Sequence, residues 1–144
     1  MRSVIIHLQD ATANEVVQFL QSKYPFQQGP PWICDVAGDP CLFIDFYRDR
    51  LTEFEAEDLA ALTTVLGKEP VISVIADVSG RHCGDEQVYS LVVTMLERFA
   101  GVAQDDYTQH YWICTEIKSG SRVQGRRFFD YTESSIAGAS EVER

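Results

Sequence analysis

Val71-Ile-Ser-Val-Ile-Ala-Asp-Val78 is the strongest strand signal in the chain and decides how the other elements are placed. Only Ser73 and Asp77 interrupt its apolar character, and both faces of the strand are otherwise apolar. This pattern is typical of a strand that lies inside a sheet and is covered on both sides. We therefore expect 71–78 to be a central strand.

The residues before this strand predict three strands and two helices. Thr12-Ala-Asn-Glu15 and Thr52-Glu-Phe-Glu55 are capping boxes, in which the Thr hydroxyl and the Glu carboxylate bind exposed backbone N–H groups at a helix start. Ala37-Gly-Asp-Pro40 has turn chemistry between two strand-like runs and predicts an antiparallel hairpin. The predicted elements are strands over 3–8, 32–36 and 41–47, a helix from 12 to Pro25, and a helix from 52 to Gly67.

After the central strand the sequence predicts one more helix and one more strand. Asp85 is placed to cap the helix and Gly101 to end it, with an apolar stripe at helical spacing between them. Tyr111 to Ile117 resembles a last strand. Residues 132–144 are rich in Ser, Ala, Gly and Glu and are predicted to form a flexible tail.

Taken in order, these elements predict a single α+β domain over residues 1–131. The first six follow the order β-α-β-β-α-β of a ferredoxin-like sandwich, in which two helices cover one face of an antiparallel sheet. The remaining α-β unit is expected to extend that sheet.

The composition is that of a globular chain. Hydrophobic residues make up 45% of its 144 residues, and the longest apolar runs are far shorter than the roughly 20 residues of a membrane helix. The first residues lack the apolar core of a secretory signal, so we expect a cytoplasmic protein. Cys34, Cys41, Cys83 and Cys114 have no Cys-x-x-Cys spacing and are expected to be buried free thiols, with a Cys34–Cys41 disulfide across the hairpin as the open alternative.

The net charge of −10 favours a basic partner. An acidic body repels phosphate backbones, so nucleic-acid binding is not expected, although solubility alone also explains the acidity. The segment 118–127 is the exception, with four basic residues and no acidic one. Carboxylates beside exposed aromatic rings are typical of protein-binding surfaces. The candidate partner-binding residues are Glu53, Glu55, Glu57 and Asp58 on the second predicted helix, and Asp105, Asp106 and Tyr107 near the end of the domain.

His82 and Cys83 form the main alternative site, because they lie between the central strand and a helix start. A thiol there would feel the helix N-terminus, and an imidazole can act as its base, as in a small cysteine-dependent enzyme. Asp85 and Glu86 oppose a reactive thiol, and no third residue is fixed by the sequence. A polar turn is the preferred interpretation, and the glycine spacing of a phosphate-binding loop is absent.

A second cluster, Asp105-Asp106 followed by His110, has residue types that hold divalent metals. Adjacent residues of a strand point in opposite directions, so the two carboxylates are not expected to share an ion. We expect no metal and no cofactor. His7 is predicted to be a hydrogen-bonded residue of the first strand.

The runs 78–86, 101–107 and 125–131 resemble small, uncharacterised acidic bacterial proteins, and in size and acidity the chain is similar to immunity proteins of bacterial toxin systems. The resemblance implies a cytoplasmic protein that covers a toxin's active site with acidic and aromatic side chains. We thus expect a non-catalytic protein-binding domain rather than an enzyme. The alternatives are the Cys83–His82 enzyme and a regulatory module that binds a small ligand, as ferredoxin-like sheets do when they pair edge to edge in a homodimer.

Overall fold

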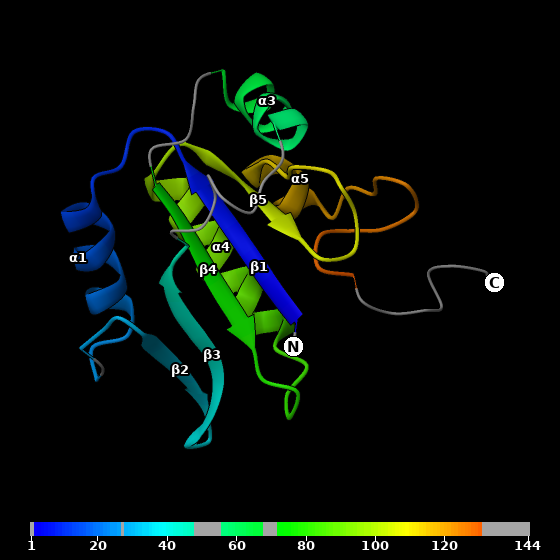
Figure 1. Cartoon of the computed structure of the whole chain (residues 1–144). Coiled ribbons are helices and arrows are strands. Elements are labelled where there is room, and N and C mark those ends of the chain that lie inside the picture. Colours follow the sequence, from blue (N-terminus) through cyan, green and yellow to red (C-terminus); the bar gives the residue numbers. More distant parts are fainter. Residues whose placement is uncertain (1, 27, 48–55, 68–71, 131–144) are drawn as a thin grey trace.

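A computed structural model describes residues 2–26, 28–47, 56–67 and 72–130. The predicted capping box at 52–55 and the predicted tail at 132–144 lie outside this part of the chain. The elements, labelled as in Figure 1, are β1 (Arg2–Leu8), α1 (Ala13–Lys23), β2 (Trp32–Val36), β3 (Asp39–Phe46), α3 (Ala56–Leu66), β4 (Ile72–Val78), α4 (Asp85–Arg98), β5 (Gly101–Asp105) and α5 (Cys114–Ser119).

The strands form one five-stranded sheet in the order β2-β3-β4-β1-β5, with every neighbouring pair antiparallel. β4 is the middle strand, which confirms the prediction for 71–78, and the α+β class is also confirmed (Figure 1). The ferredoxin-like order is not confirmed. That order has β1 between β3 and β4, whereas here β4 lies between β3 and β1. The order of elements along the chain does not decide between these two strand orders, because β1 and β4 are both apolar enough for an interior position in the sheet.

α1 and α4 cover one face of the sheet (Figure 1). Alternate residues of a strand point to the same face, and on β1 and β4 those pointing toward these helices are buried. The side chains of this core include Val4, Ile6, Leu42, Ile44, Val74 and Ala76 from the sheet, Val16 and Leu20 from α1, and Leu91 and Met95 from α4.

α3 contributes to the opposite face. Its Leu62 and Leu66 pack against Val102 of β5, with Tyr111 beside them. His7 of β1 is fully buried on the same side, with its ring edge-on to Tyr111. Among the described residues no helix is long and apolar enough to cross a membrane.

The last strand is not where the sequence predicts it. β5 covers 101–105 and pairs with β1, whereas 111–117 contains only a single bridge, from Trp112 to Ala103, before α5 begins. β5 begins at Gly101, where glycine is required because a Cβ would overlap the His7 carbonyl oxygen. The apolar run that suggested a strand belongs instead to the start of a short helix, where the Glu116 carboxylate accepts a bond from the Ile113 N–H.

The predicted caps of α1 and α4 can be compared with the structure, and only that of α1 is present. The Thr12–Glu15 capping box is present at the start of α1, as predicted. α4 begins at Asp85, but its N-cap is Gly84, with φ of 73° and no side-chain cap, so the prediction that Asp85 caps the helix is wrong. Only glycine fits the N-cap position well, since a Cβ would lie 2.6 Å from Val78 Cγ1.

All four cysteines are free thiols, but only Cys41 is buried, as predicted. Cys34 and Cys114 are half-buried and Cys83 is exposed, so the prediction of burial is wrong for Cys83. In the hairpin, Cys34 stands opposite Leu42 rather than Cys41, so the two thiols are not cross-strand partners.

Candidate binding site

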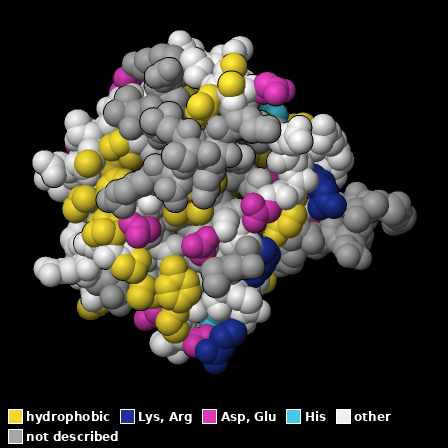
Figure 2. All heavy atoms as spheres, viewed as in Figure 1, with side chains coloured by type: hydrophobic (Ala, Val, Ile, Leu, Met, Phe, Trp, Pro, Cys, Tyr) yellow, Lys and Arg dark blue, Asp and Glu magenta, His cyan; other side chains and the backbone are white. Residues whose placement is uncertain are grey.

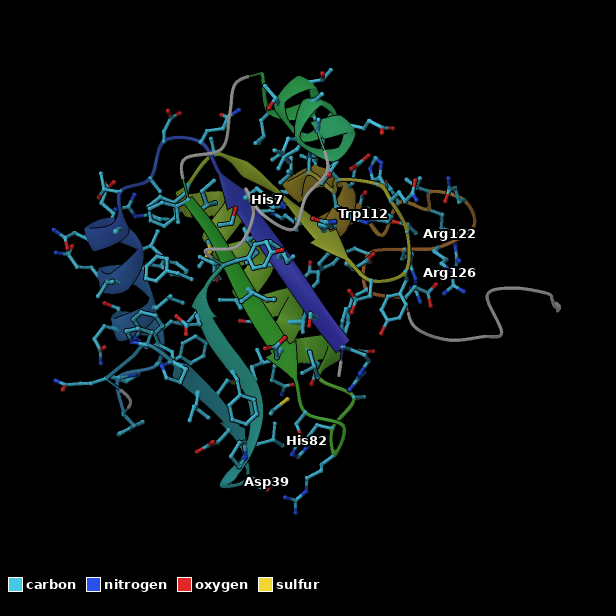
Figure 3. All side chains as sticks on the ribbon, in the orientation of Figure 1. His7, Asp39, His82, Trp112, Arg122 and Arg126 are labelled. Carbon is cyan, nitrogen blue, oxygen red and sulfur yellow. The ribbon has the colours of Figure 1, made fainter. Side chains whose placement is uncertain are left out.

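The loop between β4 and α4 carries Arg81, His82 and Cys83, which lie near Asp39 at the start of β3. We call these four residues the turn cluster. His82 Nε2 lies 2.7 Å from Asp39 Oδ2, and an Arg81 guanidinium nitrogen lies 3.4 Å from Asp39 Oδ1. Figure 3 shows Asp39 and His82 together at the tip of the β2–β3 hairpin. These contacts tie the hairpin to the loop that precedes α4.

The backbone of this loop is bound from its other side by Arg2. The guanidinium of Arg2 donates to the carbonyl oxygens of Cys83, at 2.8 Å, and of Ser79 and His82. The Cys83 side chain is exposed, and among the described residues it makes no hydrogen bond with His82. The geometry therefore holds a loop in place and does not assemble a nucleophile with its base.

Asp105 lies inside the protein, although the sequence suggested it as a partner-binding residue. It is 4% exposed. Its Oδ2 accepts from the Phe129 N–H at 2.6 Å, and its Oδ1 from the Tyr107 and Thr108 N–H groups at 3.1 and 3.2 Å. Desolvation raises the pKa of Asp105 above its ordinary value, against the opposing effect of these backbone donors. Asp105 cannot contact a partner directly, because the strand direction points it into the core.

The neighbours of Asp105 do not converge on an ion. Asp106 is exposed and accepts from the Ser3 N–H at 2.9 Å, whereas Tyr107 packs on the Phe129 ring, 5.8 Å between centroids. His110 Nε2 lies 2.9 Å from Glu116 Oε1. Within the described ranges no group of three or more His, Cys, Asp and Glu side chains is arranged to hold a metal.

The acidic set predicted on the second helix is only partly visible. Glu57 is exposed on α3. Glu53, Glu55 and the side chain of Asp58 lie outside the described residues. Acidic side chains on the viewed face are spread over it rather than gathered in one block (Figure 2). The site prediction for these four residues stays a prediction.

A hollow of about 550 Å³ lies between the start of α4 and the end of α5, and no sequence pattern predicts it. We call it the α4–α5 hollow. Its walls include Asp85, Glu86 and Tyr89 of α4, residues 117–120, and residues 127–130. The lining thus joins the start of α4 to two segments that follow it by 28 to 45 residues in the chain.

The floor of the hollow is apolar and firmly held. Ile117 and Phe129 are 5% and 6% exposed, and Phe128 lies edge-on to Trp112. Phe129 has φ of 56°, a backbone conformation that bulky residues rarely adopt. The bond from its N–H to Asp105 holds that conformation and ties the floor to β5.

The charged groups of the hollow differ in what they already bind. Lys118 Nζ lies 2.8 Å from Glu97 Oε2, which raises the pKa of Lys118. The Asp130 side chain is 5% exposed, and its Oδ2 lies 4.0 Å from an Arg122 guanidinium nitrogen. In contrast, the side chains of Glu86 and Arg127 make no hydrogen bond or ion pair with any described residue. Those two charges are available to a ligand.

His7 takes part in a second buried polar group that sequence reasoning did not assemble. His7 Nδ1 lies 2.8 Å from Ser73 Oγ, and His7 Nε2 lies 3.0 Å from Gln104 Oε1. A serine beside an imidazole is a possible nucleophile pair, but His7 is 0% and Ser73 2% exposed. The group therefore joins three strands and is closed to a substrate.

No protein-family model, curated protein or solved structure matches the chain. The assignment of function below therefore depends on the geometry and charge of the α4–α5 hollow.

Proposed function

We propose that the protein is a non-catalytic protein-binding domain and that the α4–α5 hollow is its binding surface. The observation that carries the proposal is the combination of an aromatic floor with two charges, on Glu86 and Arg127, that the described residues leave unpaired. Binding surfaces gain most of their affinity from a few aromatic anchors surrounded by polar groups. The hollow supplies both.

Tyr89 supports this assignment. Its side chain lies at the wall of the hollow and is 44% exposed, which makes it one of the few large apolar residues that the described surface leaves open. A ring in this position can bury further area against a partner at a low cost in side-chain entropy. Glu86 lies three residues before it, on the same face of α4.

The net charge of −10 favours a basic partner, because an acidic surface accelerates encounter with a positively charged protein. The specific form that we propose is an immunity-type inhibitor, which would neutralise a basic toxin by occupying part of its surface. Its binding should weaken as salt is added, since long-range attraction between exposed charges is screened.

The size of the hollow also favours a second candidate function, the binding of a small ligand. A volume of about 550 Å³ lies within the range of small-molecule sites, roughly 300–1,000 Å³. A small ligand of the folded protein would raise its melting temperature in proportion to the logarithm of ligand concentration. A thermal-shift screen against metabolites, with no protein partner added, separates this function from the first.

The test of the proposal is retention of proteins from a lysate on immobilised wild-type protein and on two variants. Tyr89→Arg places a charge in the hollow. Val65→Arg is the matched control, because Val65 is 48% exposed on α3, outside the hollow. Both variants are expected to fold, as each changes an exposed position.

We expect wild type and Val65→Arg to retain the same partner in equal amounts, and Tyr89→Arg to retain at least tenfold less of it. Added salt should release this partner from the wild-type protein. Equal retention by all three proteins would contradict the proposal. So would a partner lost from both variants, because its site would then include α3.

A further inference from the structure

We infer that the α4–α5 hollow takes a peptide segment of the partner that carries charges of both signs, with a basic side chain toward α4, an acidic group toward Arg127, and an apolar side chain between them. This inference rests on the proposed function and adds the chemistry of the occupant. It also specifies the direction in which the occupant lies.

The α4 wall suits a basic side chain. Glu86 is exposed and without a partner in the described part of the chain, and Asp85 is exposed beside it. Tyr89, one helical turn further on, adds an aromatic ring that is 44% exposed. A carboxylate next to an exposed ring binds Lys or Arg twice, through an ion pair and through the attraction of a cation to the ring.

The part of the lining that Arg127 contributes suits an acidic group. Arg127 is exposed, and its Cδ lies 3.8 Å from the position of a Cβ on Gly120, so the absence of a side chain at 120 leaves room along the arginine. A guanidinium with no partner can hold a carboxylate through two parallel hydrogen bonds.

The other two arginines of this loop hold its shape. Arg126 donates to the Asp130 carbonyl oxygen at 2.6 Å, and Arg122 to the Gly125 carbonyl oxygen at 3.0 Å. Figure 3 shows Arg122 and Arg126 close together on the segment that follows α5. With these two engaged within the loop, Arg127 is the cation that remains for a ligand in the hollow.

A bipolar segment is the occupant that fits both walls. An anion alone would pair with Arg127 but leave Glu86 unpaired in the same hollow, and a cation alone would pair with Glu86 but leave Arg127 unpaired. Covering Glu86 or Arg127 without an opposite charge would also cost the hydration of that group. The apolar floor of Ile117, Phe128 and Phe129 supplies the contact for the residue between the two charges.

The test is selection of random peptides displayed on phage against immobilised, folded proteins. The targets are wild type, Glu86→Lys, Arg127→Glu and the double variant. Asp35→Lys and Arg81→Glu are matched charge controls, since both residues are exposed and lie outside the hollow. Enriched peptides are then synthesised, and their affinities are measured for all six proteins and for Tyr89→Arg.

We expect wild-type peptides to have a basic and an acidic residue on either side of an apolar one. Glu86→Lys should select peptides without the basic residue, Arg127→Glu peptides without the acidic one, and the double variant peptides with the two charges exchanged. Each single change should weaken a wild-type peptide at least tenfold, and the controls should not.

The outcomes separate the two proposals. The first outcome is a set of peptides that bind Tyr89→Arg more weakly than wild type but bind Glu86→Lys and Arg127→Glu as tightly as wild type. That result would overturn the bipolar occupant and leave the binding function in place. Peptides that bind Tyr89→Arg as well as wild type, or no enrichment at all, overturn both.

Discussion

The turn cluster and the α4–α5 hollow lie on either side of one helix start, yet they use their polar residues differently. Asp39 binds both Arg81 and His82, and Arg2 donates to the carbonyl oxygens of the loop that carries these two residues. Across the helix start, Glu86 and Arg127 bind no described residue, although both line a hollow with an aromatic floor.

This difference teaches that reactive residue types do not by themselves make a site. The turn cluster has a thiol, an imidazole and a carboxylate within a short distance, but the imidazole and the carboxylate stabilise a loop. The hollow has no nucleophile pair of that kind, but it has surface and charge that nothing within the described chain has used. The predictions below test this division of roles.

The largest effect is expected from Asp105→Ala, which removes the anchor of the hollow's floor. Three backbone N–H groups lose their acceptor, and the free energy of unfolding should fall by about 3 kcal/mol. Urea unfolding measures the change. Asp106→Ala is the control, since exposed Asp106 accepts only the Ser3 N–H among the described contacts. Equal losses in the two variants would show that Asp105 has no special role.

Gly84→Ala should have the next largest effect, because it strains the junction between the two regions. The alanine must keep φ near 73°, and its Cβ must avoid Val78 Cγ1. We expect a loss of about 2 kcal/mol in thermal or urea unfolding. Gly38→Ala also has positive φ but open space around its Cβ, so it should cost less. If Gly38→Ala lowers the free energy of unfolding as much as Gly84→Ala does, the contact with Val78 does not contribute to the effect at Gly84.

The pH dependence of Asp105 should be smaller, since it involves a single proton. Its pKa is raised in the folded protein above 3.8, so the folded state binds the proton first as pH falls. Wild type should therefore gain stability relative to Asp105→Asn as pH falls through the folded pKa toward 3.8. Unfolding free energies of both proteins across this window give the difference. If the unfolding free energy of wild type fell relative to that of Asp105→Asn as pH was lowered, the raised pKa of Asp105 would be contradicted.

The smallest effect is expected from Asp39→Asn in the turn cluster. Its partners are partly exposed, so the loss should be below about 1 kcal/mol, and peptide binding at the hollow should not change. Unfolding and affinity measurements on the same preparation check both statements. A tenfold loss of affinity would place the turn cluster within the binding surface.

The sequence predicted the features that short segments determine. The capping box from Thr12 to Glu15 closes within one helical turn, and the apolar character of 72–78 is enough to place β4 inside the sheet. Strand order was not predictable in this way, because it depends on which of several apolar strands become neighbours. The run 111–117 shows the same limit, since a few apolar residues fit a strand or a short helix equally well.

The candidate site was hidden for the same reason. The sequence predicts an exposed Asp105, but the direction of β5 points its side chain into the core. The basic character of 118–127 was visible in the sequence, but its significance depends on Arg127 lining the same hollow as Glu86. No local pattern joins those two residues, because the packing of α5 beside α4 brings them together.

The most direct test of the central claim is a map of amide chemical shifts in the ¹⁵N-labelled protein during titration with a peptide selected on wild type. We predict shifts concentrated at Tyr89, residues 117–120 and residues 127–130, with little change at Asp39 and residues 80–83. Shifts centred on the turn cluster, with the hollow unchanged, would contradict the account.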